Sequence, residues 1–187
     1  MAVLIGPSGC GKTTTLKMIN RLIEPTAGRI YLDGQDITTK DKVELRRHIG
    51  YVIQQIGLFP NMTVAQNICV VPKLLKYPKE RCEQIVRDML AMVDMPYEQY
   101  AHKYPSEMSG GQQQRVGVAR ALVVDPQIIF ADEPTGNLDS ENSELVFSLL
   151  QELAHEDGYC IIVVTHDLTI AEKADEVLRM KDGMLID

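Results

Sequence analysis

The chain has 187 residues, of which 45% are hydrophobic and 24% are charged, and its formal net charge at pH 7 is −7. This composition is typical of a globular domain, and the length allows one sizeable core or a core with a small inserted lobe. The acidic charge argues against a nucleic-acid-binding surface, no apolar run approaches the ~20 residues of a membrane-spanning helix, and the four scattered cysteines lack metal-site spacing.

A phosphate-binding loop is predicted near the start of the chain. An apolar run over residues 2–5 predicts a strand, and a helix is predicted over residues 14–23. The intervening residues are Gly6, Pro7, Ser8, Gly9, Cys10, Gly11, Lys12, Thr13 and Thr14. The glycines permit a backbone that turns N–H groups inward around an anion, ahead of a helix N-terminus. We therefore predict that the loop holds nucleotide phosphates, with Lys12 on the β- and γ-phosphates and the Thr13 hydroxyl on Mg²⁺. The alternative, a glycine turn without a ligand, requires a coincidence expected in roughly one chain in a hundred.

The next segment predicts two strands on either side of a helix. A short strand closed by an Asp-Gly turn is predicted over residues 29–34, and a polar helix over residues 41–48. The apolar residues 49–53 predict a second strand, which ends at Gln54. Gln54 therefore lies at the carboxyl end of a predicted strand.

Residues 63–104 have helical patterns and no strand signal, which predicts a helical lobe inserted between elements of the sheet. The clearest helix is predicted over residues 79–95, where apolar residues recur at helical spacing: Ile85, Val86, Met89, Leu90 and Val93. Such a stripe favours core packing over a cofactor site. Ser109 is a plausible N-cap for the next helix, which is predicted to run to about Val124.

The last third of the chain alternates strands and helices. Strands are predicted over residues 127–131, 159–164 and 176–180, and helices over residues 140–156 and 168–174, with an Asp182-Gly183 turn at the end. In the longer helix one apolar face is expected to comprise Leu145, Leu149, Leu150 and Leu153. This alternation predicts a largely parallel sheet covered on both faces, with ligands at the carboxyl ends of its strands.

Asp132 and Glu133 follow one of these strands directly. In phosphate-loop NTPases a carboxylate after an apolar strand holds Mg²⁺, which is the role predicted for Asp132. Glu133 follows at the next position, where strand alternation aims it differently, as a general base that polarises the attacking water requires. A solvated strand end is the alternative for an isolated Asp-Glu pair, but the upstream phosphate loop favours function. The loop, Gln54, Asp132, Glu133 and His166 all lie at strand ends, so one shared site is expected.

Six motifs occur here in the order typical of ATP-binding cassette (ABC) ATPases, and the resemblance covers essentially the whole chain. Two of the motifs are the phosphate loop and Asp132-Glu133. The other four resemble a Q-loop at Gln54, a signature motif at residues 108–115, a D-loop at Asn137-Leu138-Asp139 and a switch histidine at His166. In the signature motif, Met108 replaces the usual leucine.

The resemblance implies an α/β fold, that of a phosphate-loop NTPase with a mostly parallel sheet flanked by helices and an inserted helical lobe. It implies a single ABC ATPase domain over residues 1–187, incomplete at its N-terminus, because the adenine-stacking aromatic residue and the accompanying strands of the family lie upstream of the phosphate loop. The RecA-like core would comprise residues 1–62 and 125–187, and the helical subdomain with the signature motif residues 63–124.

The resemblance also implies a site shared by two subunits. A second anion-binding helix start, formed by Ser109, Gly110, Gly111 and Gln112, would serve the γ-phosphate held by the other subunit, so two cassettes would pack head to tail around two ATP molecules. Gln54 would touch Mg²⁺ or the attacking water, His166 would contact the γ-phosphate, and Asp139 would shape the contact across the dimer.

The implied function is ATP hydrolysis that powers a membrane transporter. The chain would be a peripheral subunit on the cytoplasmic face of the cell membrane, bound to transmembrane permease subunits, with a substrate-binding protein as a further partner of importers. Residues 16–21 and 57–60 resemble ATPases of bacterial importers for quaternary amines such as glycine betaine, carnitine and choline. Residues 132–140 are more similar to ATPases of lipoprotein-release and macrolide-export systems, so both systems stay open.

Three other functions are weighed against this one. A small phosphate-loop kinase would suit the length but has no need of residues 109–112 or of Glu133 beside Asp132. An ABC ATPase of DNA repair or translation usually carries long coiled coils or two cassettes in one chain. A nucleotide-binding module without turnover is the third alternative, which phosphate release with and without Mg²⁺ would distinguish from an enzyme.

Overall fold

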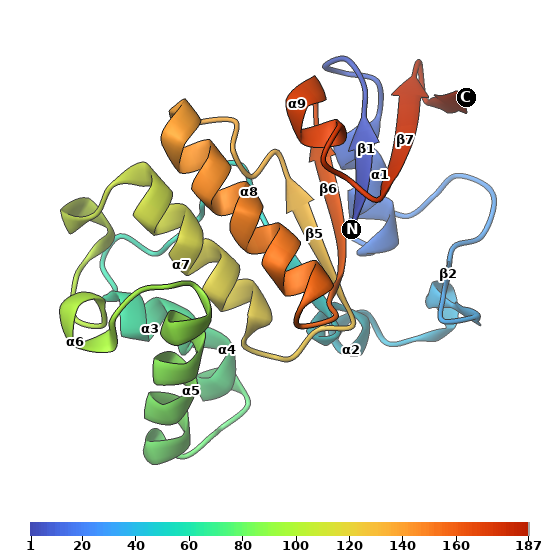
Figure 1. The fold of residues 1–187 in the computed structure, drawn as a ribbon. Helices are drawn as coiled ribbons and strands as arrows, with labels where there is room; N and C mark the ends of the chain where they lie inside the picture. The colour runs from blue at the N-terminus through green and yellow to red at the C-terminus, as the bar shows by residue number, and fades with distance from the viewer. Residues whose placement is uncertain (187) are drawn as a thin grey trace.

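A six-stranded sheet forms the centre of the molecule in the computed structural model, which describes residues 1–186 (Figure 1). The strand order is β4-β5-β6-β1-β7-β8, and every neighbouring pair is parallel except β7 and β8. The strands span β1 Ala2–Ile5, β4 Ile49–Val52, β5 Ile128–Asp132, β6 Cys160–Thr165, β7 Glu176–Lys181 and β8 Met184–Ile186. The predicted α/β fold with a mostly parallel sheet is confirmed.

Helices cover both faces of this sheet, and strand alternation divides its side chains between two cores. On one face, Leu4, Phe130 and Val164 pack with Leu16 of α1 (Lys12–Ile19) and Leu45 of α2 (Lys42–Arg47). On the other face, the intervening strand residues pack under α7 (Gly110–Leu122), α8 (Ser140–His155) and α9 (Leu168–Ala171). Because both faces are covered, the central strands are buried almost completely, as a parallel sheet requires.

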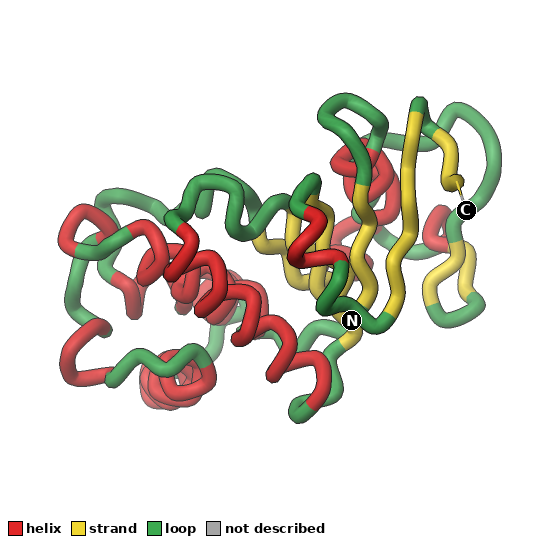
Figure 2. The backbone as a smooth tube through the Cα atoms, turned by 45° about the horizontal axis from the view of Figure 1, so that its top comes forward, coloured by secondary structure: helices red, strands yellow, loops and turns green. Residues whose placement is uncertain are grey.

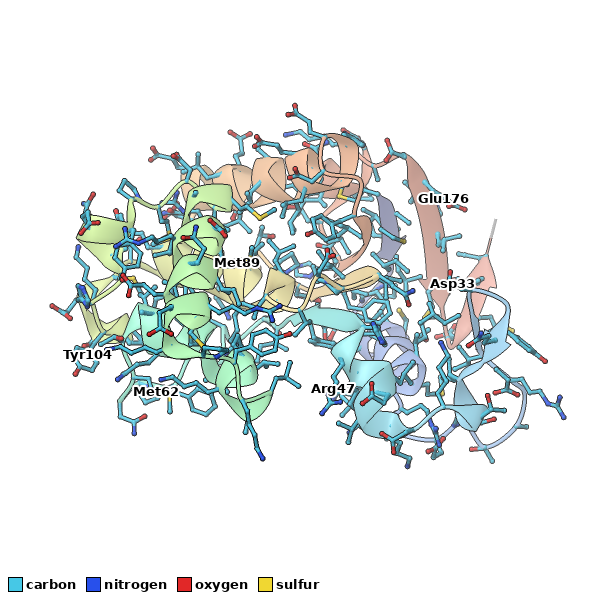
Figure 3. The ribbon with its side chains drawn as sticks, turned by 90° about the horizontal axis from the view of Figure 1, so that it is seen from below. Asp33, Arg47, Met62, Met89, Tyr104 and Glu176 are labelled. Carbon is cyan, nitrogen blue, oxygen red and sulfur yellow. The ribbon has the colours of Figure 1, made fainter. Side chains whose placement is uncertain are left out.

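Four short or medium helices form a lobe to one side of the sheet. They are α3 Val64–Ile68, α4 Val70–Leu74, α5 Lys79–Met92 and α6 Tyr97–Tyr100, followed by the 3₁₀ turn η2 Pro105–Glu107. In Figure 3, Met62, Met89 and Tyr104 mark this lobe on one side, whereas Asp33 and Glu176 lie on the opposite side of the molecule. The apolar stripe of α5 faces the core, with Val86, Leu90 and Val93 buried, which confirms the packing role predicted for it.

Two hairpins lie at the edge of the molecule opposite the lobe (Figure 2). The two-stranded sheet of β2 (Tyr31–Leu32) and β3 (Gln35–Asp36) turns at Asp33 and Gly34, with φ of 50° and 72°. The hairpin of β7 and β8 turns at Asp182 and Gly183, with φ of 51° and 83°. Two consecutive positive φ angles match the turn that Asp-Gly favours in tight hairpins. The sequence indicated both turns, but the strand after each of them was not predicted.

A buried polar side chain fixes the loop between β4 and α3. Asn67 is fully buried, and its Oδ1 accepts from the Phe59 N–H at 2.7 Å. Its Nδ2 donates to the carbonyl oxygens of Phe59, Met62 and Thr63 at 3.1–3.2 Å. Since a buried amide is costly unless its hydrogen bonds are made, this arrangement holds residues 59–63 in one conformation.

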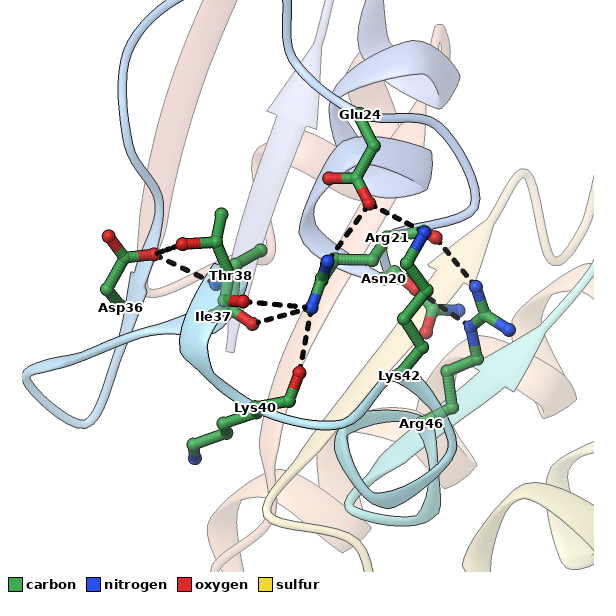
Figure 4. Close-up of polar contacts among 9 residues, drawn as sticks. All are labelled: Asn20, Arg21, Glu24, Asp36, Ile37, Thr38, Lys40, Lys42 and Arg46. Carbon is green, nitrogen blue, oxygen red and sulfur yellow. Dashed lines mark hydrogen bonds and ion pairs between the residues drawn. The ribbon is translucent and has the colours of Figure 1, made fainter.

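Two arginines tie the end of α1 to the segment that leads into β4 (Figure 4). Arg21 Nη1 donates to the carbonyl oxygens of Ile37, Thr38 and Lys40, at and beyond the 3₁₀ turn η1 (Ile37–Thr39). Arg46 of α2 donates in return to the Asn20 and Arg21 carbonyls at 3.1 and 2.6 Å. The helix behind the phosphate loop and α2 are therefore fixed together.

Two expectations about helices are corrected. The first helix spans residues 12–19 rather than 14–23. It begins early because the loop glycine Gly11, with φ of 111°, is its N-cap, and it ends before Arg21, whose φ of 50° is not helical. In α8, Leu149, Leu150 and Leu153 are buried as expected, but Leu145 is 53% exposed. Leu145 lies about 100° around the helix from buried Val146, at the margin of the core face.

Within residues 1–186, no helix is both long and apolar enough to cross a membrane.

Candidate active site

The loop between β1 and α1 is held tightly against β7. A Cβ added to Gly6 would lie 2.1 Å from the Met180 carbonyl oxygen, so only glycine fits there. Gly9 and Gly11 have φ of 80° and 111°, which L side chains rarely adopt. The Lys12 side chain is only 5% exposed, and its ammonium group donates to the Gly6 and Pro7 carbonyl oxygens at 2.6 and 3.0 Å. Lys12 is therefore held inside the loop that it is predicted to serve.

Thr13 and Asp132 are brought together although they lie far apart in the sequence. The Thr13 hydroxyl donates to Asp132 Oδ1 at 2.9 Å, although 119 residues separate the two. The order of the sheet produces this contact, because β1 and β5 both pair with β6 and end at the same edge. A hydroxyl and a carboxylate side by side are the hard oxygen ligands that Mg²⁺ takes, and Mg²⁺ usually keeps several waters beyond one or two carboxylates. The residues present therefore fit this ion, even though no three His, Cys, Asp or Glu side chains gather as a metal cluster within residues 1–186.

Glu133 and His166 form a second pair at this edge. His166 Nδ1 lies 3.1 Å from Glu133 Oε2, and the side chains are 64% and 20% exposed. Glu133 has φ of 49°, so it has left the regular strand, although its N–H still donates to the Val164 carbonyl oxygen at 2.8 Å. The different aim of Glu133 thus comes from a left-handed backbone, a costly conformation for a residue other than glycine, and not from the strand alternation on which the prediction relied.

Gln54 lies near Glu133. Asn137 Nδ2 donates to the Gln54 carbonyl oxygen at 3.1 Å. A Cβ added to Gly136 would lie 3.0 Å from Gln54 Nε2 and 3.3 Å from Glu133 Oε2. The loop after β4 and the loop after β5 therefore meet around Gly136, and the structure brings together Thr13, Gln54, Asp132, Glu133 and His166 at one edge of the sheet.

A cavity of about 650 Å³ opens beside this cluster. Its lining includes Glu133, Gly136, Leu138, Thr165 and His166. Polar and apolar groups both face it, so the cavity can admit water or a polar segment next to Glu133.

The signature segment begins a different helix. The Ser109 hydroxyl accepts from the Gln112 N–H at 3.3 Å, and Gln112 Oε1 accepts from the Ser109 N–H at 3.1 Å, which completes a capping box at the start of α7. The predicted N-cap is confirmed. In Figure 1, α7 and α1 lie on either side of α8 and the central strands. Ser109, Gly110, Gly111 and Gln112 are thus placed apart from Lys12 within one chain.

Asp139 caps α8 next to the signature segment. Its carboxylate accepts from the Asn142 N–H and from Asn142 Nδ2 at 2.8–2.9 Å, and these hydrogen bonds lower the pKa of Asp139. A separate contact joins α7 to the loop after Gln54, because Arg120 donates to the Gly57 and Ile56 carbonyl oxygens at 2.7 and 3.1 Å. The helix that the signature segment begins is therefore tied to the loop after Gln54.

Tyr51 was not predicted as a site residue. Its hydroxyl donates to Asp132 Oδ2 at 3.3 Å. The sequence partly indicates this position, since Tyr51 lies three residues before Gln54, on a strand that is expected to end at the edge of the sheet where Asp132 lies. The register that pairs Tyr51 with Phe130 and places both on the face of Asp132 comes only from the sheet.

These features define a class of protein, a phosphate-loop NTPase of the ATP-binding cassette type, with a glycine-rich loop, a carboxylate pair and a separate capped signature helix. The chain belongs to the ABC transporter family, whose profile matches residues 1–136.

Two relatives from Bacillus subtilis are about equally similar to the chain. The glycine betaine/carnitine/choline transport ATP-binding protein OpuCA is 54% identical over 183 residues, which cover 97% of this chain and 48% of OpuCA. The choline transport ATP-binding protein OpuBA is 54% identical over 186 residues, with the same two shares. The chain therefore spans about half the length of these curated relatives.

Solved structures agree with the fold. The ATP-binding cassette MJ0796, from Methanocaldococcus jannaschii, is 38% identical to this chain, with a TM-score of 0.86. The match covers all of this chain and 83% of the MJ0796 chain. One structure of MJ0796 is a dimer in a post-hydrolysis state bound to ADP and Pi. The cbiO1 protein of Clostridium perfringens, part of the transporter complex cbiONQ, is 31% identical with a TM-score of 0.90 over all of this chain and 75% of that one.

Proposed function

We propose that this chain binds and hydrolyses ATP as the ATPase of a membrane ABC transporter that takes up quaternary amine osmolytes. The observation that carries the enzymatic part is the convergence of Thr13, Asp132, Glu133 and His166 behind a phosphate loop. The osmolyte is supported by relatives named for glycine betaine, carnitine and choline transport at 54% identity.

Each side chain at the sheet edge has a role in this proposal. Lys12 and the loop N–H groups hold the β- and γ-phosphates, and Glu133 accepts a proton from the attacking water. His166, which contacts Glu133, holds that water and the γ-phosphate in line. Gln54 completes the arrangement from the neighbouring loop. The left-handed backbone at Glu133 supports the assignment, since strained conformations persist where function requires them.

Mg²⁺ is proposed as the metal cofactor. Thr13 and Asp132 would hold it, directly and through water, because their oxygens already lie 2.9 Å apart. When bound, the ion would neutralise charge that develops on the transferred phosphoryl group.

The proposal includes an ATP-dependent dimer. At the start of α7, which lies apart from α1, Ser109 and Gly110 are exposed, Gln112 is half-buried and Gly111 is buried. A second copy, placed head to tail, would bring this helix start to the γ-phosphate, with Asp139 at the contact. The dimeric state of the MJ0796 cassette supports this arrangement.

Permease subunits are the second proposed partner, which would place the chain on the cytoplasmic face of the cell membrane. A groove of about 410 Å³ lies between α2, β4, α4 and α7, and its lining is mostly apolar. Leu74 and Val43 in that lining are 76% and 55% exposed. In this proposal residues 63–124 act as the helical subdomain and residues 1–62 and 125–187 as the core, with the groove between them. A substrate-binding protein would be a third component.

Phosphate release from ATP tests the enzymatic part. We expect the purified chain to release phosphate only when Mg²⁺ is added, and Lys12→Ala to abolish the release. A chain that binds ATP but never releases phosphate would instead support a nucleotide-binding module without turnover.

The solute is tested in proteoliposomes that contain the full transporter. ATP supplied on the side of this subunit should drive uptake of radiolabelled glycine betaine, choline or carnitine. Outward movement of a lipoprotein or macrolide would support the export alternative, which the resemblance of residues 132–140 keeps open.

A further inference from the structure

The Asp132 carboxylate receives two hydroxyl donors, one on each oxygen. Thr13 donates to Oδ1 at 2.9 Å from the phosphate-loop helix, and Tyr51 donates to Oδ2 at 3.3 Å from the neighbouring strand β4. The first contact belongs to the site already described. The second comes from a residue to which the proposed mechanism gives no role.

The position of the Tyr51 ring is fixed by packing and not by the hydrogen bond. Tyr51 pairs with Phe130 across β4 and β5, and the two rings meet edge to face with centroids 6.3 Å apart and an interplanar angle of 68°. Edge-to-face aromatic pairs are favourable and directional. Phe130 and Asp132 are two residues apart on β5, so their side chains lie on the same face of the sheet. Because Tyr51 packs against Phe130 on that face, its hydroxyl lies beside the Asp132 carboxylate.

In this contact the Tyr51 hydroxyl is the donor and the Asp132 carboxylate oxygen is the acceptor.

We propose that Tyr51 is a positioning residue that holds the Asp132 carboxylate with Oδ1 toward Thr13, and so raises the affinity of the nucleotide complex for Mg²⁺. This inference rests on the proposed function, because it concerns the same metal ligand. An aspartate carboxylate rotates through a broad torsional well, so a single donor on Oδ1 leaves its orientation loosely defined. A donor on each oxygen fixes the plane of the carboxylate while lone pairs stay available for the ion or its water.

The experiment compares the chain with its Tyr51→Phe variant, which removes the hydroxyl and keeps the ring. A fluorescent ATP analogue is titrated in EDTA and then at increasing Mg²⁺ concentrations. We expect the affinity for the analogue in EDTA to be unchanged. We expect the Mg²⁺ concentration that gives half of the Mg²⁺ effect to be about tenfold higher in Tyr51→Phe than in the parent. Residues that orient metal ligands typically change metal affinity by 10- to 100-fold. The lower end is expected here because a hydrogen bond of 3.3 Å is long and therefore weak.

A matched control exists outside the site. The Tyr159 hydroxyl also donates to an aspartate, Asp125 Oδ1, at 3.3 Å. Tyr159→Phe should leave both titrations unchanged, which separates positioning of Asp132 from a general loss of a tyrosine hydrogen bond. Tyr51→Met, which keeps apolar volume without a hydroxyl, should reproduce the weaker Mg²⁺ dependence if Tyr51→Phe expresses poorly.

Three outcomes overturn the proposal. Equal Mg²⁺ dependence in the parent and Tyr51→Phe removes the role of Tyr51 and leaves the proposed function intact. Equal loss of affinity with and without Mg²⁺ assigns Tyr51 to general stability. A parent chain that binds no nucleotide, or binds it without any effect of Mg²⁺, overturns the assignment of Asp132 as metal ligand and with it the proposed function.

Discussion

Gly111 of α7 and Asn142 of α8 lie so close together that a Cβ added to Gly111 would be 2.1 Å from Asn142 Oδ1. The Asn142 amide is not free to move away, because its Nδ2 donates to both carboxylate oxygens of Asp139 at 2.9 and 2.8 Å. The signature segment and the D-loop are therefore packed together within one chain, before any second copy is considered.

Gly111→Ala is expected to destabilise the chain through this contact. In a helix interior alanine is more favourable than glycine by about 1 kcal/mol, so at Gly111, in the first turn of α7, a gain of at most about that size would ordinarily be expected. Overpacking against Asn142 should reverse the sign and lower the free energy of unfolding by roughly 1–3 kcal/mol. Urea denaturation measures this change. A variant as stable as the parent would show that the two helices move apart at little cost.

The cause can be checked with Asn142→Ala as a second substitution. This change removes the amide but leaves the Asn142 Cβ, which would be 2.9 Å from the new methyl group. The cost of Gly111→Ala should therefore shrink by at least about 1 kcal/mol in the Asn142→Ala background, as expected for residues in contact. Additive effects would place the strain elsewhere.

Lys12→Ala is expected to abolish tight ATP binding. Lys12 is the buried cation of the phosphate loop, with its ammonium group against the Gly6 and Pro7 carbonyl oxygens, and its charge is assigned to the β- and γ-phosphates. We expect a loss of ~100-fold or more in affinity for a fluorescent ATP analogue, about 2.7 kcal/mol or more. Lys17→Ala, an exposed lysine on the same helix, is the control and should bind normally. Unchanged binding by Lys12→Ala would remove the assigned role.

The four thiols should react with alkylating agents at very different rates. Cys160 is exposed, whereas Cys10, Cys69 and Cys82 are buried, and Cys10 belongs to an apolar cluster with Leu16. Burial raises the pKa of Cys69 to about 11, so even at pH 9 its thiolate fraction is only about 1%. Mass spectrometry after timed labelling at pH 7 and pH 9 should find Cys160 modified first and Cys69 nearly unmodified at both pH values. Early labelling of Cys69 would contradict the packing of the lobe.

Glu133→Gln is expected to separate binding from turnover. The amide keeps the size of the side chain but cannot accept the proton, while Thr13 and Asp132 are untouched. Turnover should fall by ~10²-fold or more, since positioned acid–base groups typically contribute 10²–10⁴. Glu172→Gln, at an exposed position after α9, serves as the control. Hydrolysis at the parental rate by Glu133→Gln would exclude Glu133 as the base.

The same variant tests the two-chain site. ATP that is bound but not hydrolysed should hold two chains together, so gel filtration of Glu133→Gln should show a dimer with ATP and not with ADP. Ser109→Arg, added to Glu133→Gln, should abolish that dimer by blocking the start of α7. A variant that stays monomeric under saturating ATP would undercut the shared site while leaving the base in place.

Local patterns in the sequence determined the class of fold and most of its elements. Strand–loop–helix order, the Gly-Lys-Thr triplet and the alternation of strands with helices depend on residues close together in the chain. The helices α5 and α7 begin where they were predicted and end two or three residues earlier. The Asp-Gly turns were equally local. The short strands after them were not predicted, because two or three residues become a strand only when a partner supplies hydrogen bonds.

The tertiary structure decided which side chains meet. The contact between Thr13 and Asp132 spans 119 residues and follows from the strand order, which no local pattern encodes. The aim of Glu133 depends on its positive φ, which strand alternation did not predict, and Tyr51 reaches Asp132 only through the register of β4 on β5. Motif spacing in the sequence identifies the side chains that can take part in chemistry. The distances between them are set by the pairing of distant strands, because burial over the whole sheet fixes the register of that pairing.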